Sequence, residues 1–426
     1  MRYNKINNGL FKKNRSLFTK EMDNNSIAIF NSNDLMPKNA DQEMLFKQNS
    51  DLFYLSGIDQ EETILMLIKA NNIVTTHLFI RKTNEHIKVW EGEKLSKKRA
   101  SEISGINEVR WNNDFKNLFY DCVKMANTIY LNSNEHPRAN IVVESRDARF
   151  KKWFQNKFPN TIIKKAPEIL YPIRAIKKNL EIDLIEKACD ITSLGVDRVL
   201  KFLKPGVYEY EIEAEILHEF IRQRSSGFAY DPIIASGANA CILHYNLNNK
   251  ICNDGDVILM DFGAEYANYS SDLTRCFPVS GRFNKRQRKI YNSVLNVLKG
   301  AKKLLKPGTL LEDYEKEVGK LMEKELVDLG LLSTNDIQNY NSAPAYKRYY
   351  MHGTSHHLGL DVHDVSGINQ PLSEGMVLTC EPGIYVPEEG IGIRLENDIL
   401  IGKNTNTDLM RNIPIEVEEI EDRLNI

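Results

Sequence analysis

The chain has 426 residues, of which 42% are hydrophobic and 27% charged, a composition typical of a globular protein of two or three domains. Its 56 basic and 58 acidic residues leave a formal net charge of −2, which excludes a global attraction to nucleic acid or to an anionic membrane. No stretch approaches the roughly 18 consecutive apolar residues that a membrane-spanning helix needs.

Residues 1–172 are expected to form a smaller, mixed α/β N-terminal domain. The first twenty residues are locally basic but lack the apolar run of a secretory signal, so we expect a solvated arm. Apolar runs then predict strands at 52–58, 63–68, 76–82 and 128–132.

A domain boundary is predicted within APEILYPIRAIKKNLEID (166–183), where two prolines precede a basic patch and a long amphipathic helix signal. We place this boundary between residues 172 and 173. Residues 173–426 then form the second domain.

The second domain contains an approximate internal repeat. LKPG occurs at 203–206 and again at 305–308. Each copy lies between two stretches with helical spacing of apolar residues, and Pro-Gly is a common stop signal for a helix. The predicted helices are 180–203, 208–224, 285–305 and 310–330. This repeated context predicts two related halves, each with two helices followed by strands.

The first half continues into a predicted β-hairpin that carries two acids. The strand VILMDFG contains Asp261, and the return strand DLTRCFPV begins with Asp272. A turn centred between Tyr266 and Ala267 would place the two acids directly opposite each other. Directly opposed Cβ atoms lie roughly 4.5–5.5 Å apart, so two buried carboxylates there would repel each other.

The second half has the same design. One strand ends in Glu381, residues 387–390 form a turn, and the return strand carries Glu396. The midpoint of the two acids falls in the centre of that turn, which predicts that they are cross-strand neighbours. A bulge at Pro382 and Gly383 is the alternative.

Four clustered carboxylates need a positive partner, which can be an arginine, a proton shared within a pair, or divalent metal. Arg394 lies two residues before Glu396 on the same strand face, but one guanidinium cannot balance four acids. A lone acid in a strand more often has a structural role than a role as a metal ligand. Two matched pairs favour a site for two metals that share carboxylates and polarise one water.

The stretch MHGTSHHLGLDVHD (351–364) contains four of the nine histidines, and one imidazole would complete a five-ligand site. Its glycines argue against a regular helix, so helical spacing cannot select the ligand. The six cysteines form no CxxC pair, which argues against a zinc–thiolate site. We expect reduced, buried thiols in a cytoplasmic protein.

Taken together, these motifs resemble the pita-bread metallopeptidases of the M24 type, which include methionine aminopeptidase, prolidase and aminopeptidase P. The matching segments are CILHY (241–245), LMDFGAEYANYSSDLTR (259–275), MHGTSHHLGLDVHD (351–364), LTCEPGIYV (378–386) and GIGIRLENDI (390–399). The resemblance implies an α+β fold, with a C-terminal pita-bread catalytic domain of duplicated ααβ halves. KNADQEMLFKQNSDLFYLSGI (38–58) and VWEGEKL (89–95) resemble the smaller N-terminal domain of the proline-specific members.

The resemblance implies that five residues hold two divalent metal ions. By position these ligands are Asp261, Asp272, His356, Glu381 and Glu396. Asp272 and Glu396 would bridge the metals, Asp261 would cap one metal, and His356 with Glu381 would cap the other. Mn²⁺ is the expected metal, with Fe²⁺, Co²⁺ or Zn²⁺ as alternatives.

The resemblance also implies roles for side chains near the metals. Glu381 would accept a proton, and His244 and His363 would bind the substrate carbonyl or the tetrahedral intermediate. His352 and Arg394 would line the substrate pocket, and Arg394 is also expected to neutralise acids of the site.

Several of these histidines and Arg394 also have structural alternatives. These are core packing for His244, a bond to Asp364 for His363, and an ion pair for Arg394. His357 stands where aminopeptidase P usually has a bulky aromatic residue, and we expect a structural role for it. Trp90 is expected to serve packing or a subunit contact.

The function implied is that of a Xaa-Pro aminopeptidase, in which a metal-activated hydroxide attacks the carbonyl before a proline at the second position. Serine before His356 is more typical of aminopeptidase P than of prolidase, the alternative, which takes only dipeptides. A metal-free enzyme such as creatinase, or a binding module such as the pita-bread histone chaperones, would lack several ligands. The expected partners are peptides with an Xaa-Pro N-terminus, and the family suggests a homodimer or homotetramer.

Overall fold

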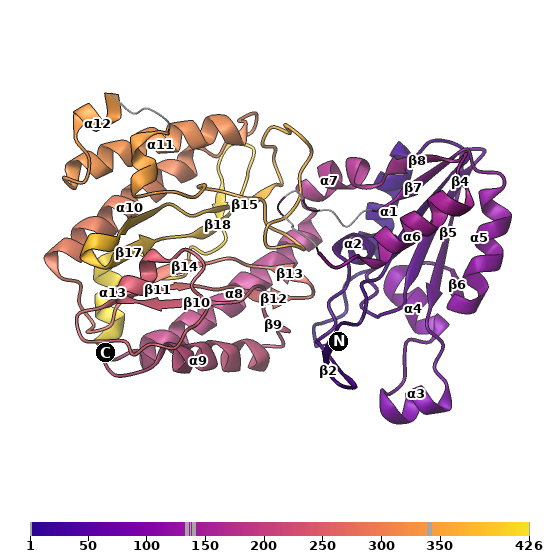
Figure 1. Cartoon of the computed structure of the whole chain (residues 1–426), viewed down its shortest axis with the longest axis horizontal. Helices are drawn as coiled ribbons and strands as arrows, with labels where there is room; N and C mark the ends of the chain where they lie inside the picture. Colours follow the sequence, from indigo (N-terminus) through magenta and orange to yellow (C-terminus); the bar gives the residue numbers. More distant parts are fainter. Residues whose placement is uncertain (1, 133–135, 137, 139–141, 339–342, 426) are drawn as a thin grey trace. The chain divides into compact units, whose positions relative to one another are not determined.

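The computed structural model describes residues 2–132, 136, 138, 142–338 and 343–425. Contacts within the chain divide it into two compact units, Tyr3–Arg174 and Ala175–Ile426, drawn from indigo to yellow in Figure 1. The division lies two residues beyond the one predicted from the sequence. Each unit is described by itself below.

The N-terminal unit is built on a six-stranded mixed sheet with the order β6-β5-β4-β1-β7-β8. Its strands are β1 (Ser26–Asn31), β4 (Ile64–Ala70), β5 (Ile73–Ile80), β6 (Glu108–Trp111), β7 (Thr128–Leu131) and β8 (Ile162–Lys165), and β2 (Pro37–Asn39) pairs with β3 (Gln42–Glu43). Its helices are α1 (Gly9–Glu21), α2 (Ser50–Ser56), α3 (Glu85–Trp90), α4 (Lys97–Ser104), η1 (Asn112–Asp114), α5 (Phe115–Val123), α6 (Arg146–Lys157) and α7 (Pro167–Ala175). The strands predicted at 63–68, 76–82 and 128–132 are confirmed as β4, β5 and β7.

Two predictions for this unit are wrong. The segment 52–58 is not a strand, because Ser50–Ser56 forms helix α2. The Asn49 side chain caps its start, and Gly57 ends it with φ +67°. A short apolar run does not distinguish a strand from a buried helix, and here the caps decide between them.

The basic N-terminal segment is not a solvated arm. Residues Gly9–Glu21 form α1, whose buried face includes Phe11 and Phe18. Arg15 is also buried, and its guanidinium donates hydrogen bonds to the carbonyl oxygens of Leu55 at 2.6 Å and Ser104 at 2.9 Å. The helix was missed because its basic residues were all assumed to be exposed. Arg15 instead lies on the buried face, where it binds main-chain oxygens.

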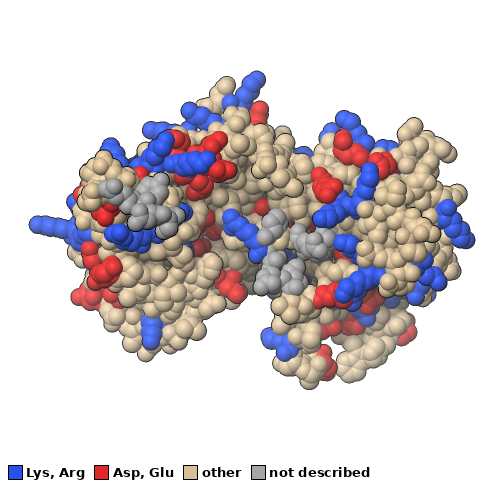
Figure 2. Space-filling view, turned by 45° about the horizontal axis from the view of Figure 1, so that its top comes forward, with Lys and Arg blue, Asp and Glu red and all other residues tan. Residues whose placement is uncertain are grey.

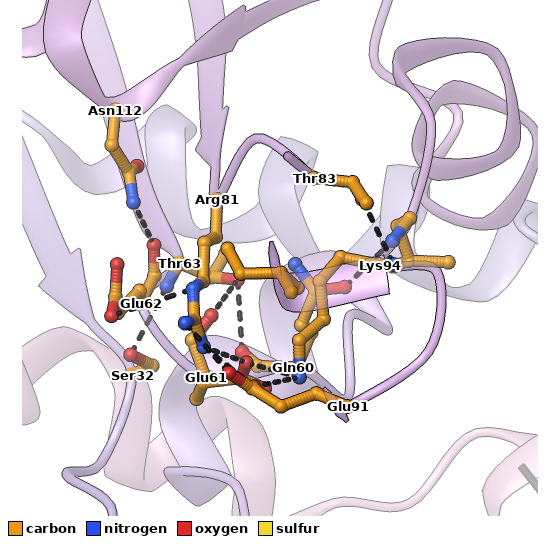
Figure 3. Close-up of polar contacts among 12 residues, drawn as sticks. Ser32, Gln60, Glu61, Glu62, Thr63, Arg81, Thr83, Glu91, Lys94 and Asn112 are labelled. Atoms are coloured by element: carbon orange, nitrogen blue, oxygen red, sulfur yellow. Dashed lines mark hydrogen bonds and ion pairs between the residues drawn. The ribbon is translucent and has the colours of Figure 1, made fainter. Parts of the chain in front are cut away.

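A network of charged side chains holds the segment that contains α3 (Figure 3). Glu61 Oε1 lies 3.0 Å from Arg81 and 2.8 Å from Lys94, and Glu91 Oε2 lies 3.0 and 2.9 Å from the same two cations. At the end of α3, Trp90 is 76% exposed. Its ring packs against the His86 ring, with centroids 6.0 Å apart, and a subunit contact stays a prediction.

The C-terminal unit contains the predicted repeat of helix pairs. Its helices are α8 (Asn179–Phe202), α9 (Glu209–Arg222), η2 (Gly237–Cys241), α10 (Lys285–Leu304), α11 (Leu311–Asp328), α12 (Thr334–Gln338), η3 (Ala345–Arg348), η4 (Pro387–Glu389) and α13 (Val417–Leu424). Its strands are β9 (Gly227–Phe228), β10 (Ile233–Ser236), β11 (Val257–Asp261), β12 (Ala264–Tyr266), β13 (Tyr269–Ser270), β14 (Thr274–Pro278), β15 (Val377–Cys380), β16 (Gly383–Val386), β17 (Ile391–Arg394), β18 (Asn397–Leu400) and β19 (Thr407–Asp408). In Figure 1 these strands lie between α9 at the bottom and α11 at the top. The α+β class and the duplicated pita-bread plan are confirmed.

The register predicted for the first hairpin is wrong by two residues. Strand β11 pairs with β14 so that Asp261 lies opposite Thr274, not Asp272. The turn is centred between Ala267 and Asn268, whose φ angles are +54° and +67°. Two successive positive φ angles are the signature of a type I′ turn, which matches strand twist. Asp261 and Asp272 are therefore diagonal neighbours on the hairpin.

The register predicted for the second hairpin is confirmed. Cys380 pairs with Asn397 in one ladder, and Gly383 pairs with Arg394 in the next. The same offset holds on both sides of Glu381, so the alternative of a bulge does not apply. Glu381 and Glu396 thus occupy opposite positions.

The strands of the two halves are joined through buried main-chain contacts. The backbone N–H of Glu396 donates to the carbonyl oxygen of Thr274 at 3.1 Å. The fully buried Arg275 donates to the carbonyl oxygens of Thr274 and Glu396 at 2.9 and 2.7 Å. These bonds bring the acid pairs of the two halves together.

The surface charge and the helix hydropathy match what the composition predicts. On the face drawn in Figure 2, acidic and basic side chains are interspersed. Within the described ranges, no helix is both long and apolar enough to cross a lipid bilayer.

Candidate metal centre and catalytic site

Four acids and one histidine meet where the two hairpins of the C-terminal unit join. Asp261 ends β11 and Asp272 precedes β14, while Glu381 follows β15 and Glu396 links β17 to β18. One possible ligand atom each from Asp272, His356 and Glu396 lies within 4.8 Å of the others, and all three residues are buried. The structure therefore brings together the acids that the sequence analysis paired.

His356 comes from the irregular stretch 351–364, which runs alongside β15. The backbone N–H of Thr379 donates to the His356 carbonyl oxygen at 2.9 Å, and that of Glu381 donates to Thr354 at 2.8 Å. The ring Nδ1 lies 3.0 Å from the His357 carbonyl oxygen, an acceptor, so Nδ1 carries the proton. The lone pair of Nε2 is then left for the acid cluster.

The surroundings of that Nε2 are strongly negative. It lies 3.4 Å from Asp272 Oδ2 and 3.5 Å from Glu381 Oε1. A lone pair facing two carboxylates is repelled unless a proton or a cation lies between them. This histidine is oriented as a metal ligand with a hydrogen bond that sets its tautomer.

Tyr230 also contacts the acid cluster, and the sequence analysis missed it. Its hydroxyl lies 2.6 Å from Asp261 Oδ1 and also contacts Asp272 Oδ1. One hydroxyl has one proton, so it cannot donate to both carboxylates. No motif in the sequence signals this contact, because Tyr230 precedes β10 and reaches the acids only through the fold.

Three acids of the cluster, Asp272, Glu381 and Glu396, have raised pKa values. Burial, followed by the neighbouring carboxylates, raises the pKa of Asp272 and of Glu396 well above the ordinary value. Burial also raises the pKa of Glu381 to about 7, although His356 and Arg394 oppose that shift. Without a cation, the cluster would therefore hold protons at neutral pH.

The donor set fits divalent metal. Carboxylate oxygens and one imidazole nitrogen, without thiolate, suit Mn²⁺ and related ions. Protonation is the alternative for neutralising the acids. The single hydroxyl proton of Tyr230 cannot serve both Asp261 and Asp272 when both are ionised, so one of them must carry a proton or bind a cation. A pair of cations would neutralise all four acids and use the Nε2 lone pair together.

Arg394 belongs to a continuous chain of hydrogen bonds beside the acids. Its guanidinium binds Asp261 Oδ2 and donates to the Tyr385 hydroxyl at 2.8 Å. Tyr385 lies 2.8 Å from His352 Nε2, whose Nδ1 lies 2.8 Å from the Gly353 carbonyl oxygen. Since that carbonyl can only accept, His352 is protonated at Nδ1 and accepts from Tyr385.

The ion pair predicted for Arg394 is present, and hydrogen bonds through Tyr385 connect it to His352. Burial, with Arg394 next, lowers the pKa of His352 to about 3. His352 is thus neutral at physiological pH, and Tyr385 is a second contact that the sequence analysis missed.

His363 and His244, the two histidines predicted to bind the substrate, lie on loops. His363 packs edge to face on His356, with ring centroids 4.3 Å apart, and its side chain is exposed. The next residue, Asp364, forms a buried ion pair with Lys177 at 2.9 Å. His244 is also exposed, in the loop after η2, so core packing is not its role.

His357 has none of the contacts with the acids that His356 makes in the described residues. It pairs with Leu378 in an isolated β-bridge, is buried, and has an Nδ1 without a hydrogen-bond partner. Burial, followed by Lys177, lowers its pKa to about 4. These contacts are those of a structural residue, as expected.

All six cysteines are free, and four of them are buried. Cys189 and Cys276 lie close to the strands that carry the acids, where burial raises their thiol pKa values. They are protonated, apolar packing groups and not ligands of the acid cluster.

Each of the two parts of the chain matches a known protein family. Residues 183–403 match the model of metallopeptidase family M24, and residues 11–130 match that of the aminopeptidase P N-terminal domain. The chain is 35% identical to the Xaa-Pro aminopeptidase of Escherichia coli (strain K12), with 96% of each chain covered. The Xaa-Pro aminopeptidase of Haemophilus influenzae is also 35% identical, with 97% of each chain covered.

Solved structures agree with these matches. Zn-substituted aminopeptidase P of E. coli in complex with product has a TM-score of 0.88 and 33% identity, over 99% of each chain. Proline aminopeptidase P II from Yersinia pestis has a TM-score of 0.88 and 31% identity, over 98% of this chain and 99% of that one.

Proposed function

Because this chain belongs to metallopeptidase family M24 and has an aminopeptidase P N-terminal domain, we propose that it is a metal-dependent Xaa-Pro aminopeptidase. It removes the N-terminal residue from peptides that have proline at the second position. The observation that carries this proposal is the placing of His356 Nε2, which lies 3.4 Å from Asp272 Oδ2 and 3.5 Å from Glu381 Oε1.

Two divalent metal ions complete the proposed centre. Asp261, Asp272, His356, Glu381 and Glu396 would hold them. Metal bound there would supply Lewis-acid activation of water and of the substrate carbonyl. Mn²⁺ is our proposed metal, since the donors are carboxylates and one imidazole.

The chain's own groups would handle protons and position the substrate. Glu381, with a pKa raised to about 7 by burial, is suited to take up a proton near neutral pH. His244 and His363 are exposed beside the cluster, where each could donate to the substrate carbonyl oxygen. Preorganised donors of this kind contribute about 2.7–4 kcal/mol each to lowering a barrier.

His352 and Arg394 would line the substrate pocket near Glu381. His352 Nδ1 lies 3.8 Å from Glu381 Oε2, and Arg394 is linked to His352 through Tyr385. The neutral imidazole and the buried guanidinium are held rigidly, which suits the orientation of a peptide.

The alternatives have less support. Prolidase is not favoured, because the two 35% identical relatives, which cover 96% and 97% of this chain, are named Xaa-Pro aminopeptidases. A metal-free enzyme or a binding module of this fold would lack several ligands, whereas four acids and one histidine converge here. We further propose a cytoplasmic homodimer or homotetramer, supported by six free cysteines and by the exposed Val89 and Trp90.

An assay of metal-stripped protein with added Mn²⁺ tests the function. We expect release of the first residue from an Xaa-Pro-Xaa tripeptide and none from a matched Xaa-Ala-Xaa tripeptide. Cleavage of an Xaa-Pro dipeptide alone would identify a prolidase instead. No hydrolysis with Mn²⁺, Fe²⁺, Co²⁺ or Zn²⁺ would exclude both peptidases.

A further inference from the structure

A buried glutamate outside the metal cluster holds both ends of the loop that carries His244. Glu209 is the first residue of α9 and is 0% exposed. Its Oε1 accepts hydrogen bonds from the backbone N–H and the hydroxyl of Ser236, both at 2.8 Å, and its Oε2 accepts from the backbone N–H of Lys250 at 2.9 Å. One carboxylate thus joins the start and the end of the loop 237–249.

Two side chains within the loop bind the same carboxylate. The Tyr245 hydroxyl donates to Oε2 at 2.7 Å, and the Asn239 amide donates to Oε1 at 3.3 Å. Tyr245 is buried and directly follows the exposed His244. Residues 242–250, all of which the structure describes, lie in no helix or strand, so these bonds define the path of the loop.

The loop lies against the strands of the proposed centre. A Cβ atom at Gly392 would be 2.3 Å from the Ala240 carbonyl oxygen, so the start of the loop packs directly on β17, which also carries Arg394. After burial, Arg394 and Lys347, His244 also lowers the pKa of His352, which places the two side chains within electrostatic range of each other.

We propose that Glu209 is a positioning residue for catalysis, whose carboxylate closes the 237–249 loop and so orients His244 toward the substrate. The inference rests on the proposed function, because His244 acts there on the substrate carbonyl. Each oxygen of Glu209 accepts one backbone N–H, from Ser236 or from Lys250. A glutamine has one acceptor oxygen and one NH₂ group, so in either orientation it leaves one of these N–H groups facing a donor.

The test compares Glu209→Gln with Glu215→Gln in the full-length, Mn²⁺-loaded protein. Glu215 lies on the same helix, where it pairs with Arg198. We expect Glu209→Gln to lower kcat by about 10–100-fold, with KM and bound metal unchanged, because a loop displaced by about 1 Å misplaces His244. Glu215→Gln should match the wild type.

A double-mutant cycle separates positioning from a general structural role. In a His244→Ala background, Glu209→Gln should lower kcat by no more than about twofold, because its effect passes through His244. If Glu209→Gln does not fold, Tyr245→Phe removes one bond from the same carboxylate and should lower kcat in the same manner, again only when His244 is present.

Three results would overturn the inference: wild-type kcat in Glu209→Gln, loss of metal in that variant, or a full multiplicative loss on top of His244→Ala. Failure of the proposed function is distinguishable, because the wild-type protein would then not cleave the Xaa-Pro-Xaa tripeptide at all.

Discussion

At the scale of single residues, two histidines in ring contact are expected to differ in role. His356 directs Nε2 at Asp272 and Glu381, whereas His363 packs edge to face on the His356 ring and is exposed. We predict that His356→Ala loses both bound metal and activity. His363→Ala should keep its metal and lose about 10²–10³-fold in kcat, the usual effect of removing one preorganised donor.

Metal content per chain and kcat, measured on the same samples, check this pair. Equal metal loss in both variants would remove His363 from the substrate side of the site. Full metal retention in His356→Ala would remove His356 from the ligand set.

His357 gives a prediction about pH. Its folded pKa is about 4, below the ordinary value of about 6.5. The unfolded chain therefore binds a proton that the folded chain does not, and stability falls as pH falls from about 6.5 to about 4. His357→Phe should remove this loss, which at pH 5 amounts to about 2 kcal/mol.

Urea unfolding of wild type and His357→Phe at pH 5 and pH 7.5 measures this effect. The variant should lose less stability than the wild type between the two pH values. Equal pH dependence in both proteins would show that His357 is protonated in the folded state as readily as in the unfolded one.

At the scale of elements, the contact between η2 and β17 depends on a residue without a side chain. A Cβ at Gly392 would lie 2.3 Å from the Ala240 carbonyl oxygen and 2.5 Å from its carbon. Real Cβ atoms do not approach a backbone that closely, so one element has to move. We predict that Gly392→Ala displaces the η2 loop, destabilises the fold by about 1–3 kcal/mol and lowers kcat.

The measurements are urea unfolding, kcat and bound metal. Metal should be retained, because no ligand lies on the displaced loop. A variant with wild-type kcat would mean that β17 shifts instead of the loop that carries His244.

At the scale of the whole molecule, the acid cluster links stability to metal and to pH. In the metal-free protein the folded state holds protons at Asp272, Glu381 and Glu396 that the unfolded chain releases. Its stability should therefore fall as pH rises from the ordinary carboxyl range toward about 7 and above. Bound metal replaces those protons.

We therefore predict that Mn²⁺ raises the melting temperature, and more so at pH 8 than at pH 5.5. At one hundred times Kd a bound ligand stabilises the folded state by about 2.7 kcal/mol. Calorimetry with Mn²⁺ and with a chelator at both pH values checks this. An equal increment at the two pH values would contradict displacement of protons by metal.

The sequence by itself determined the main plan of the C-terminal unit. The helix–LKPG–helix repeat predicted the four long helices α8 to α11, because apolar periodicity is a local property of the chain. The turn 387–390 placed Glu381 opposite Glu396 correctly, since an uninterrupted hairpin has one offset along its whole length.

Tertiary structure alone decided the rest. The type I′ turn at Ala267 and Asn268 gives the first hairpin a register two residues away from the predicted one. The basic N-terminal segment forms α1 because one of its faces is buried. Tyr230 reaches Asp261 across 31 positions of the chain. Glu209 reaches Lys250 across 41 positions. Neither contact has a periodic signal, because a single long-range hydrogen bond depends on how packed elements meet and not on the spacing of neighbours in the sequence.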